Sequence, residues 1–269
     1  MGYYVNVNNV KIYVEDLNPG GKKSILFLHG WPGSHRLFEY QFNELPRFGY
    51  RCVGLDTRGF GRSDKPFSGY DYNTLADDVR GVVEALGLRD FTLAGHSTGG
   101  AIAVRYMGRH KGHGVTRLVL IAAAAPSLVK RPAFPYGVDE GTILQIIEDT
   151  YQDRPRMLKD FGARFFFQQT SRAFAEWFFQ IGLAAAGWAT AAVAQTWLDE
   201  VLFTDLEAIN VPTLIAHGLH DRVVPFQLGE IQQRMIPNSR LVPFTFSGHG
   251  LFYEQKDEFN ALLVNFSQS

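Results

Sequence analysis

Short, continuous apolar runs recur along the chain, and longer segments with a helical pattern separate them. Strands that are apolar at every residue are buried on both faces, as in a parallel sheet that is covered by helices. The alternation of such strands with helices is typical of an α/β fold. The runs occupy residues 25–28, 52–55, 91–94, 118–122, 213–216 and 241–244.

Two further segments complete the predicted sheet and its helical layers. Residues 3–7 and 10–14 flank the pair Asn8-Asn9, and asparagine tolerates the positive φ that a two-residue β-hairpin needs. Residues 74–87 place apolar side chains on one face of a helix, and Gly87 is typical of a helix C-terminus. We therefore expect an antiparallel edge at the start of the chain and an amphipathic helix over 74–87.

The alternation is interrupted from about Pro126 to Asn210, where alanine-rich and aromatic helical segments replace the apolar runs. This pattern predicts a helical cap over residues 126–210, inserted into a core formed by residues 1–125 and 211–269. A chain of 269 residues, 46% of them hydrophobic, can bury one substantial core. We expect one α/β domain with an insertion rather than two independent domains.

Composition and charge argue against several partners. Lys plus Arg total 26 and Asp plus Glu total 27, and the sequence contains no run of like charges that could bind along a phosphate backbone. Nucleic acid is therefore not an expected partner. The most apolar window, residues 181–194, is too short for a bilayer and rich in alanine, which predicts a packed helix and no membrane span. Cys52, the only cysteine, is expected to be buried and unreactive.

The first residues of the chain lack the basic region and apolar core of a secretory signal, so a cytoplasmic location is expected. The sequence is compatible with a monomer and with a homo-oligomer.

The pattern Gly95-x-Ser97-x-Gly99 lies between an expected strand and an expected helix. Glycine allows backbone conformations and close approaches that a Cβ would block. The pattern therefore predicts a tight strand-to-helix turn that presents the hydroxyl of Ser97.

A serine hydroxyl needs a base, and the base needs an orienting group. His249 lies between glycines in the loop after the last expected strand, and Asp221 directly follows the strand before it. The order Ser97, Asp221, His249 is the order of an α/β-hydrolase triad. We predict that these three residues are catalytic.

Most of the other histidines are expected to have structural roles. His217, His220 and Asp221 could be drawn as a metal cluster, but no further ligand pair with zinc-like spacing supports it, so no metal is expected. Structural roles are expected for His29, His110, His113 and His217.

The oxyanion of such a reaction needs two backbone N–H donors. One is expected from Thr98, which follows the nucleophile and begins a helix. The other is expected from Trp31, in the glycine-rich loop Leu28-His-Gly-Trp-Pro-Gly33 after the first parallel strand.

Together, His-Gly-Trp-Pro, Arg58-Gly-Phe-Gly-Arg-Ser-Asp64 and Gly-His-Ser-Thr-Gly-Gly resemble the α/β-hydrolase superfamily over nearly the whole chain. Trp31-Pro32, Tyr72-Asn-Thr-Leu-Ala-Asp-Asp78 and Asp221-Arg-Val-Val-Pro-Phe226 resemble its cofactor-free haloperoxidase, perhydrolase and aryl-esterase branch most. The resemblance implies an acyl pocket lined by Trp197, Phe161 and Val223, and no cofactor.

The expected function is a carboxylesterase that acts on small, uncharged, short-acyl apolar esters. Epoxide hydrolases and haloalkane dehalogenases share the Arg58–Asp64 loop pattern, but they carry an aspartate where this chain has Ser97. His96 and Thr98 depart from the pattern of the peroxide-using branch, which commonly has Phe and Met there. Two alternatives stay open. One is a perhydrolase that makes peracids from carboxylic acids or esters and hydrogen peroxide, and the other is a ligand-binding receptor with negligible turnover.

Overall fold

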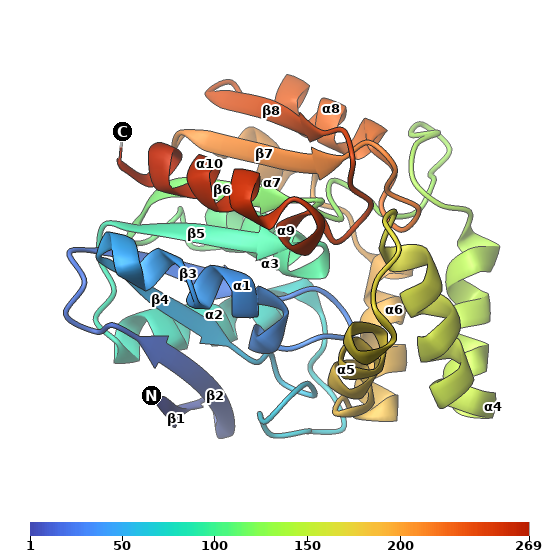
Figure 1. Ribbon diagram of the computed structural model, residues 1–269. Coiled ribbons are helices and arrows are strands. Elements are labelled where there is room, and N and C mark those ends of the chain that lie inside the picture. Colours follow the sequence, from blue (N-terminus) through green and yellow to red (C-terminus); the bar gives the residue numbers. More distant parts are fainter. Residues whose placement is uncertain (269) are drawn as a thin grey trace.

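The computed structural model describes residues 1–268, and Figure 1 shows a central sheet between helices. Its eight strands follow the order β1-β2-β4-β3-β5-β6-β7-β8. β2 is antiparallel to β1 and β4, and every other pair is parallel. The strands are β1 Gly2–Val7, β2 Val10–Leu17, β3 Lys23–Leu28, β4 Tyr50–Leu55, β5 Phe91–His96, β6 Val115–Ile121, β7 Thr213–Gly218 and β8 Ser239–Phe244.

The predicted strands are confirmed. Each of the six apolar runs lies in a parallel strand, apart from one residue beyond β6, and all residues of β5 and β7 are buried. The predicted hairpin joins β1 to β2, and Asn8 and Asn9 have φ of 49° and 65°. The chain is therefore an α/β fold with an antiparallel edge.

Helices cover both faces of this sheet. In Figure 1, α1 and α10 lie in front of it, and α2 and α3 lie behind it. The helix expected over 74–87 is α2, which begins after its N-cap Asp71, and Gly87 just beyond it has φ of 59°. These helices are α1 Glu39–Phe42, α2 Tyr72–Ala85, α3 Thr98–Arg109, α7 Phe203–Glu207, α8 Gln227–Met235, α9 Leu251–Glu254 and α10 Lys256–Gln268.

Between β6 and β7 the chain forms α4 Glu140–Phe165, α5 Arg172–Leu183 and α6 Gly187–Asp199. Figure 1 shows these three helices beyond the ends to which the arrows of β5 and β7 point. α4 is broken at Asp153 (φ −152°, ψ 75°), and Pro155 follows, a residue that cannot donate a helical hydrogen bond. The helices lie within the predicted cap, whose boundaries at 125/126 and 210/211 stay a prediction. Ser269, the end of the second predicted core segment, lies outside the described residues.

The expectation of one packed helix over residues 181–194 is wrong. α5 ends at Leu183 and α6 begins at Gly187. Between them, Ala186 donates its N–H to the carbonyl oxygen of Gly59 at 2.9 Å, a tertiary bond in place of a helical one. Within residues 1–268, no single helix has the length and apolarity to cross a membrane, and only α5 and α6 together do, with an 87° bend between them.

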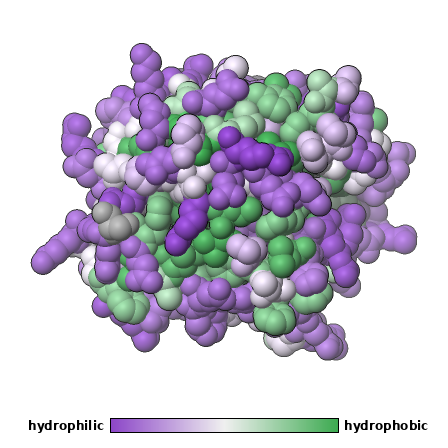
Figure 2. Space-filling model, turned by 90° about the horizontal axis from the view of Figure 1, so that it is seen from above, coloured by the Kyte–Doolittle hydropathy of each residue, from purple (hydrophilic) through white to green (hydrophobic). Residues whose placement is uncertain are grey.

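The core is continuous from the sheet into the covering helices. Cys52 in β4 is fully buried, as predicted, and burial raises the pKa of its thiol to about 12. Figure 2 shows polar side chains over much of the face seen from above, with apolar ones between them.

Candidate active site

Ser97 joins β5 to α3 with a backbone conformation that non-glycine residues rarely adopt (φ 55°, ψ −119°). Such a conformation costs about 1–3 kcal/mol and persists only where the surroundings hold it. Here the N–H of Ser97 donates to the carbonyl oxygen of Ile121 at 2.9 Å, and its own carbonyl oxygen accepts from the N–H of Ala124 at 3.0 Å. Both bonds connect the turn to β6 and the residues after it.

Glycines around Ser97 allow α3 to approach the sheet closely. A Cβ on Gly95 would collide with the carbonyl oxygen of Gly99, and a Cβ on Gly99 would collide with that of Leu28. A Cβ on Gly30, in the loop after β3, would lie 2.9 Å from the Cβ of Ser97. The Gly30 loop therefore passes directly against the serine.

His249 and Asp221 are in direct contact. Nδ1 of His249 lies 2.7 Å from Oδ2 of Asp221, and both side chains are fully buried. The other carboxylate oxygen accepts the N–H groups of Val223 at 2.8 Å and Val224 at 2.9 Å. Burial acts to raise the pKa of Asp221, but the charges and hydrogen bonds of His249 and His217 outweigh it and hold the pKa below its usual range. Asp221 is therefore an ionised carboxylate at neutral pH.

Nε2 of His249 is buried and has no hydrogen-bond partner among residues 1–268, so Ser97 Oγ does not bond to it in this structure. When neutral His249 donates Nδ1–H to Asp221, the lone pair of Nε2 is free to accept a proton. In ligand-free sites, catalytic hydrogen bonds are often long and shorten only with substrate bound.

The two predicted oxyanion donors belong to different segments, Thr98 to the start of α3 and Trp31 to the loop after β3. Thr98 is the first residue of α3, where an N–H has no partner within its own helix. Trp31 lies in a turn that the N–H of Gly33 closes by donating to the carbonyl oxygen of Gly30 at 2.8 Å. The indole of Trp31 donates to the carbonyl oxygen of Thr190 in α6 at 3.0 Å. This bond attaches the loop after β3 to α6.

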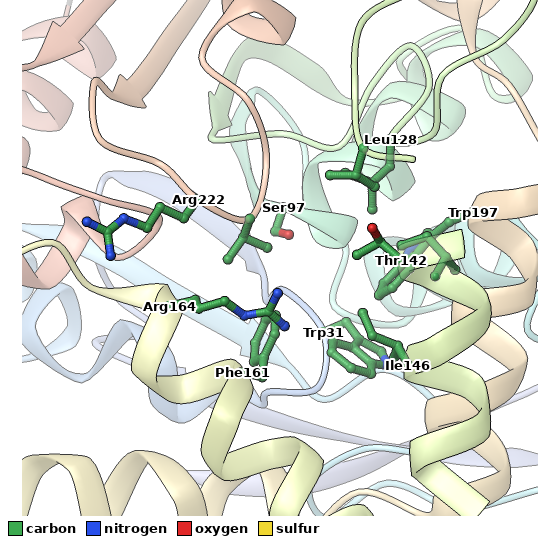
Figure 3. A pocket seen from close by; sticks show the side chains of 12 residues that line it. Trp31, Ser97, Leu128, Thr142, Ile146, Phe161, Arg164, Trp197 and Arg222 are labelled. Atoms are coloured by element: carbon green, nitrogen blue, oxygen red, sulfur yellow. The ribbon is translucent and has the colours of Figure 1, made fainter. Parts of the chain in front are cut away.

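A cavity of about 40 Å³ opens beside Ser97 (Figure 3), a volume that corresponds to three or four water-sized groups at ~10–15 Å³ each. Trp197, Phe161 and Val223, the pocket residues that the family resemblance implies, all line this cavity. The indole of Trp31 packs edge-on against Phe161 and Trp197, with ring centroids 5.1 Å and 5.0 Å apart. The lining residues are Trp31, Ser97, Leu128, Val138, Thr142, Ile143, Ile146, Phe161, Arg164, Trp197, Arg222 and Val223.

Sequence reasoning did not identify two charged residues in this lining, Arg164 and Arg222. Helical residues three apart share a face, so Arg164 lies on the same side of α4 as Phe161. That spacing was a usable signal once Phe161 was assigned to the pocket. Arg222 directly follows Asp221 in the chain.

Two further histidines contact the His249–Asp221 pair. His96 Nε2 lies 3.1 Å from the carbonyl oxygen of His249, and their ring centroids are 4.5 Å apart. Burial, then the neighbouring charge of His249, lowers the pKa of His96 well below its usual value. His217, expected to be structural, has Nε2 3.3 Å from Asp221 Oδ2 and 3.0 Å from the carbonyl oxygen of Val224. His217 thereby helps to hold the loop of Asp221.

The sheet order, the serine turn and the His249–Asp221 pair together define an α/β hydrolase. The sequence pattern of the family described as the alpha/beta hydrolase fold matches residues 23–156. The chain belongs to this superfamily.

Within the superfamily, the chain is similar to esterases and to proteins named non-heme haloperoxidases. It is 47% identical to an AB hydrolase superfamily protein of Bacillus subtilis and 31% identical to a bifunctional esterase/perhydrolase of Acinetobacter calcoaceticus, each over 100% of both chains. The solved structure of an esterase from Exiguobacterium antarcticum has 41% identity and a TM-score of 0.97, with 100% of both chains covered.

Proposed function

We propose that the protein is a serine carboxylesterase that hydrolyses small, short-acyl esters through an acyl-enzyme. The observation that carries this proposal is the turn that holds Ser97 at the small cavity. The buried His249–Asp221 pair lies next to His96, the residue that precedes Ser97 in the chain. The similarity to esterases is further support.

In the first half of the reaction, Ser97 Oγ attacks the ester carbonyl carbon while His249 Nε2 takes its proton. The carbonyl oxygen becomes an oxyanion, for which the N–H groups of Trp31 and Thr98 are the donors. The bond to the alcohol oxygen then breaks, and His249 returns the proton to the leaving alcohol. Asp221 keeps the Nδ1–H tautomer of His249 and stabilises its charged form.

In the second half, His249 takes a proton from a water molecule, which attacks the acyl-enzyme carbonyl. The bond to Ser97 Oγ breaks, the carboxylic acid leaves, and Ser97 regains its proton. No step needs a cofactor or a metal ion. The small, largely apolar cavity favours acetyl to butyryl groups as the acyl part.

The test compares the wild type and Ser97→Ala on a chromogenic acetate, with a phosphonate label and mass mapping. We expect multiple turnover in the wild type, a loss of at least about a thousandfold in Ser97→Ala, and one label at Ser97. Labelling elsewhere or unchanged turnover in the variant would contradict the mechanism. Binding without turnover in the wild type would favour the ligand-binding receptor.

A second candidate is perhydrolysis, in which hydrogen peroxide replaces water in the attack on the same acyl-enzyme. The similarity to a protein named bifunctional esterase/perhydrolase favours it. We expect peracid formation from a small acetate ester and peroxide, measured as bromide oxidation with Ser97→Ala as the blank. Hydrolysis without peracid above that blank would leave the esterase alone.

A further inference from the structure

The cavity beside Ser97 has two chemically different sides. In Figure 3, Leu128, Thr142, Ile146 and Trp197 gather on one side of Ser97, and Arg164 and Arg222 lie on the other. These two arginines are the only charged residues in the lining of this cavity. A substrate that spans Ser97 therefore meets a mostly apolar wall at one end and cationic groups at the other.

Arg164 extends its guanidinium toward the space that the Ser97 hydroxyl faces, whereas Arg222 points outward (Figure 3). Arg164 also borders a surface hollow that contains Asp149 and Asp160. Asp160 pairs with Arg156 at 3.9 Å, and Asp149 accepts from the side chain of Gln145 at 2.8 Å. Within the described part of the chain, neither Arg164 nor Arg222 has an ion pair or a side-chain hydrogen bond.

Most other arginines near the insertion are engaged. Arg131 donates to the carbonyl oxygens of Trp197 and Leu198, and Arg154 donates to those of Gly182 and Leu183. These side chains hold helix ends together. Arg164 lines the cavity, is exposed, and has no such partner among residues 1–268, so its guanidinium is free to bind a ligand there.

We propose that the natural substrate carries a carboxylate on its alcohol part and that Arg164, with Arg222 farther out, binds it. This inference rests on the proposed esterase function and specifies its substrate class as short-acyl esters of hydroxycarboxylic acids. A guanidinium binds a carboxylate through two parallel hydrogen bonds. The uncharged esters expected from the sequence are then poorer substrates.

The test is a ratio of kcat/KM values for two acetate esters, 4-acetoxybenzoate and its neutral methyl ester. The ratio cancels the difference in their chemical reactivity when variants are compared. Because Arg164 is exposed, we expect Arg164→Gln to lower the ratio by roughly three- to tenfold and Arg164→Lys to lower it less. Arg234→Gln, an exposed arginine on α8 away from the cavity, is the control and leaves the ratio within about twofold.

Ionic strength and the position of the charge give two independent checks. The wild-type ratio falls between about 0.01 M and 0.5 M salt, because screening shortens the range of the attraction. Monomethyl succinate, which carries its carboxylate on the acyl part, is hydrolysed less efficiently than methyl butyrate. An unchanged ratio in Arg164→Gln, or a preference for monomethyl succinate, overturns this inference while ester hydrolysis stands. Failure to hydrolyse any ester contradicts the proposed function itself.

Discussion

The main-chain N–H of His249 donates a hydrogen bond to the carbonyl oxygen of Phe165, the last residue of α4, at 2.9 Å. Glu254 strengthens this connection. Its carboxylate accepts the N–H groups of Phe167 and Gln168, each at 2.7 Å, and of Gly248 at 2.8 Å. One carboxylate therefore joins the chain after α4 to the loop that carries the proposed base.

Glu254→Gln tests this connection. A neutral amide accepts these N–H groups more weakly than a carboxylate and turns one end into a donor. We expect kcat to fall about tenfold with little change in KM, and the free energy of unfolding to fall by about 2 kcal/mol, measured by urea denaturation. Glu258→Gln, which changes an exposed carboxylate bonded to Gln255, should alter neither. Equal effects of the two variants would contradict a special role of Glu254.

Asp221→Asn tests the proposed orienting acid. The amide places a donor or a weaker acceptor against His249 Nδ1, so the histidine no longer keeps the required tautomer. We expect kcat to fall by roughly three to four orders of magnitude on a chromogenic acetate. Asp139→Asn changes a largely exposed carboxylate paired with Lys130 and should lose little. A small loss in Asp221→Asn would place the acid elsewhere.

The acyl chain length tests the cavity. Each methylene that fits adds about 0.8 kcal/mol of apolar burial, whereas overpacking costs about 1–3 kcal/mol. With a cavity of about 40 Å³, we expect kcat/KM for 4-nitrophenyl esters to peak at acetyl to butyryl and to fall steeply by octanoyl.

In Trp197→Ala the optimum should move to longer chains, because this residue lines the cavity. Trp188→Ala is the matched control on the same helix, since Trp188 does not line this cavity and its indole, 40% exposed, donates to the carbonyl oxygen of Pro66. If the wild-type kcat/KM were highest for long acyl chains, the small cavity would not be what selects the acyl chain length.

The low pKa of His96 predicts a pH-dependent stability. A histidine has a pKa of about 6.5 when unfolded. Burial, then the neighbouring charge of His249, lowers the pKa of folded His96 and keeps it neutral, although the charge of Asp221 acts to raise this pKa. Its contribution to stability is therefore complete above about pH 6.5 and is lost as pH falls toward its lower folded pKa. One such group changes the free energy of unfolding by up to about 1.4 kcal/mol per pH unit.

His96→Phe removes this titration and keeps an aromatic ring against Phe165 and Phe252. We expect the variant to lose less stability than the wild type between about pH 7 and 5, measured by urea unfolding at each pH. His29, whose pKa burial also lowers, still titrates in both proteins. Parallel stability curves would show that His96 does not titrate in this window.

Local sequence patterns determined the strands, the first hairpin and the turn at Ser97. The apolar runs predicted the strands because buried strands must be apolar on both faces, and Asn8-Asn9 predicted the hairpin because asparagine tolerates positive φ. The glycines around Ser97 predicted the turn because no other residue allows that approach. Each of Ser97, Asp221 and His249 follows an apolar run, so the sequence predicted that all three lie after parallel strands, at the carboxyl ends of the sheet.

The tertiary structure alone decided which distant groups meet. A helical pattern does not show that the N–H of Ala186 bonds to Gly59 and so ends the helix expected over 181–194. Nor does local sequence reveal that Glu254 joins Gly248 to Phe167. The spacing from Phe161 places Arg164 on the same face of α4, but only the tertiary structure shows that this face lines the cavity of Ser97. Each of these contacts joins segments far apart in the chain, and their relative positions depend on the packing of whole helices against the sheet. Periodicity records which face of an element is buried but not which partner covers it.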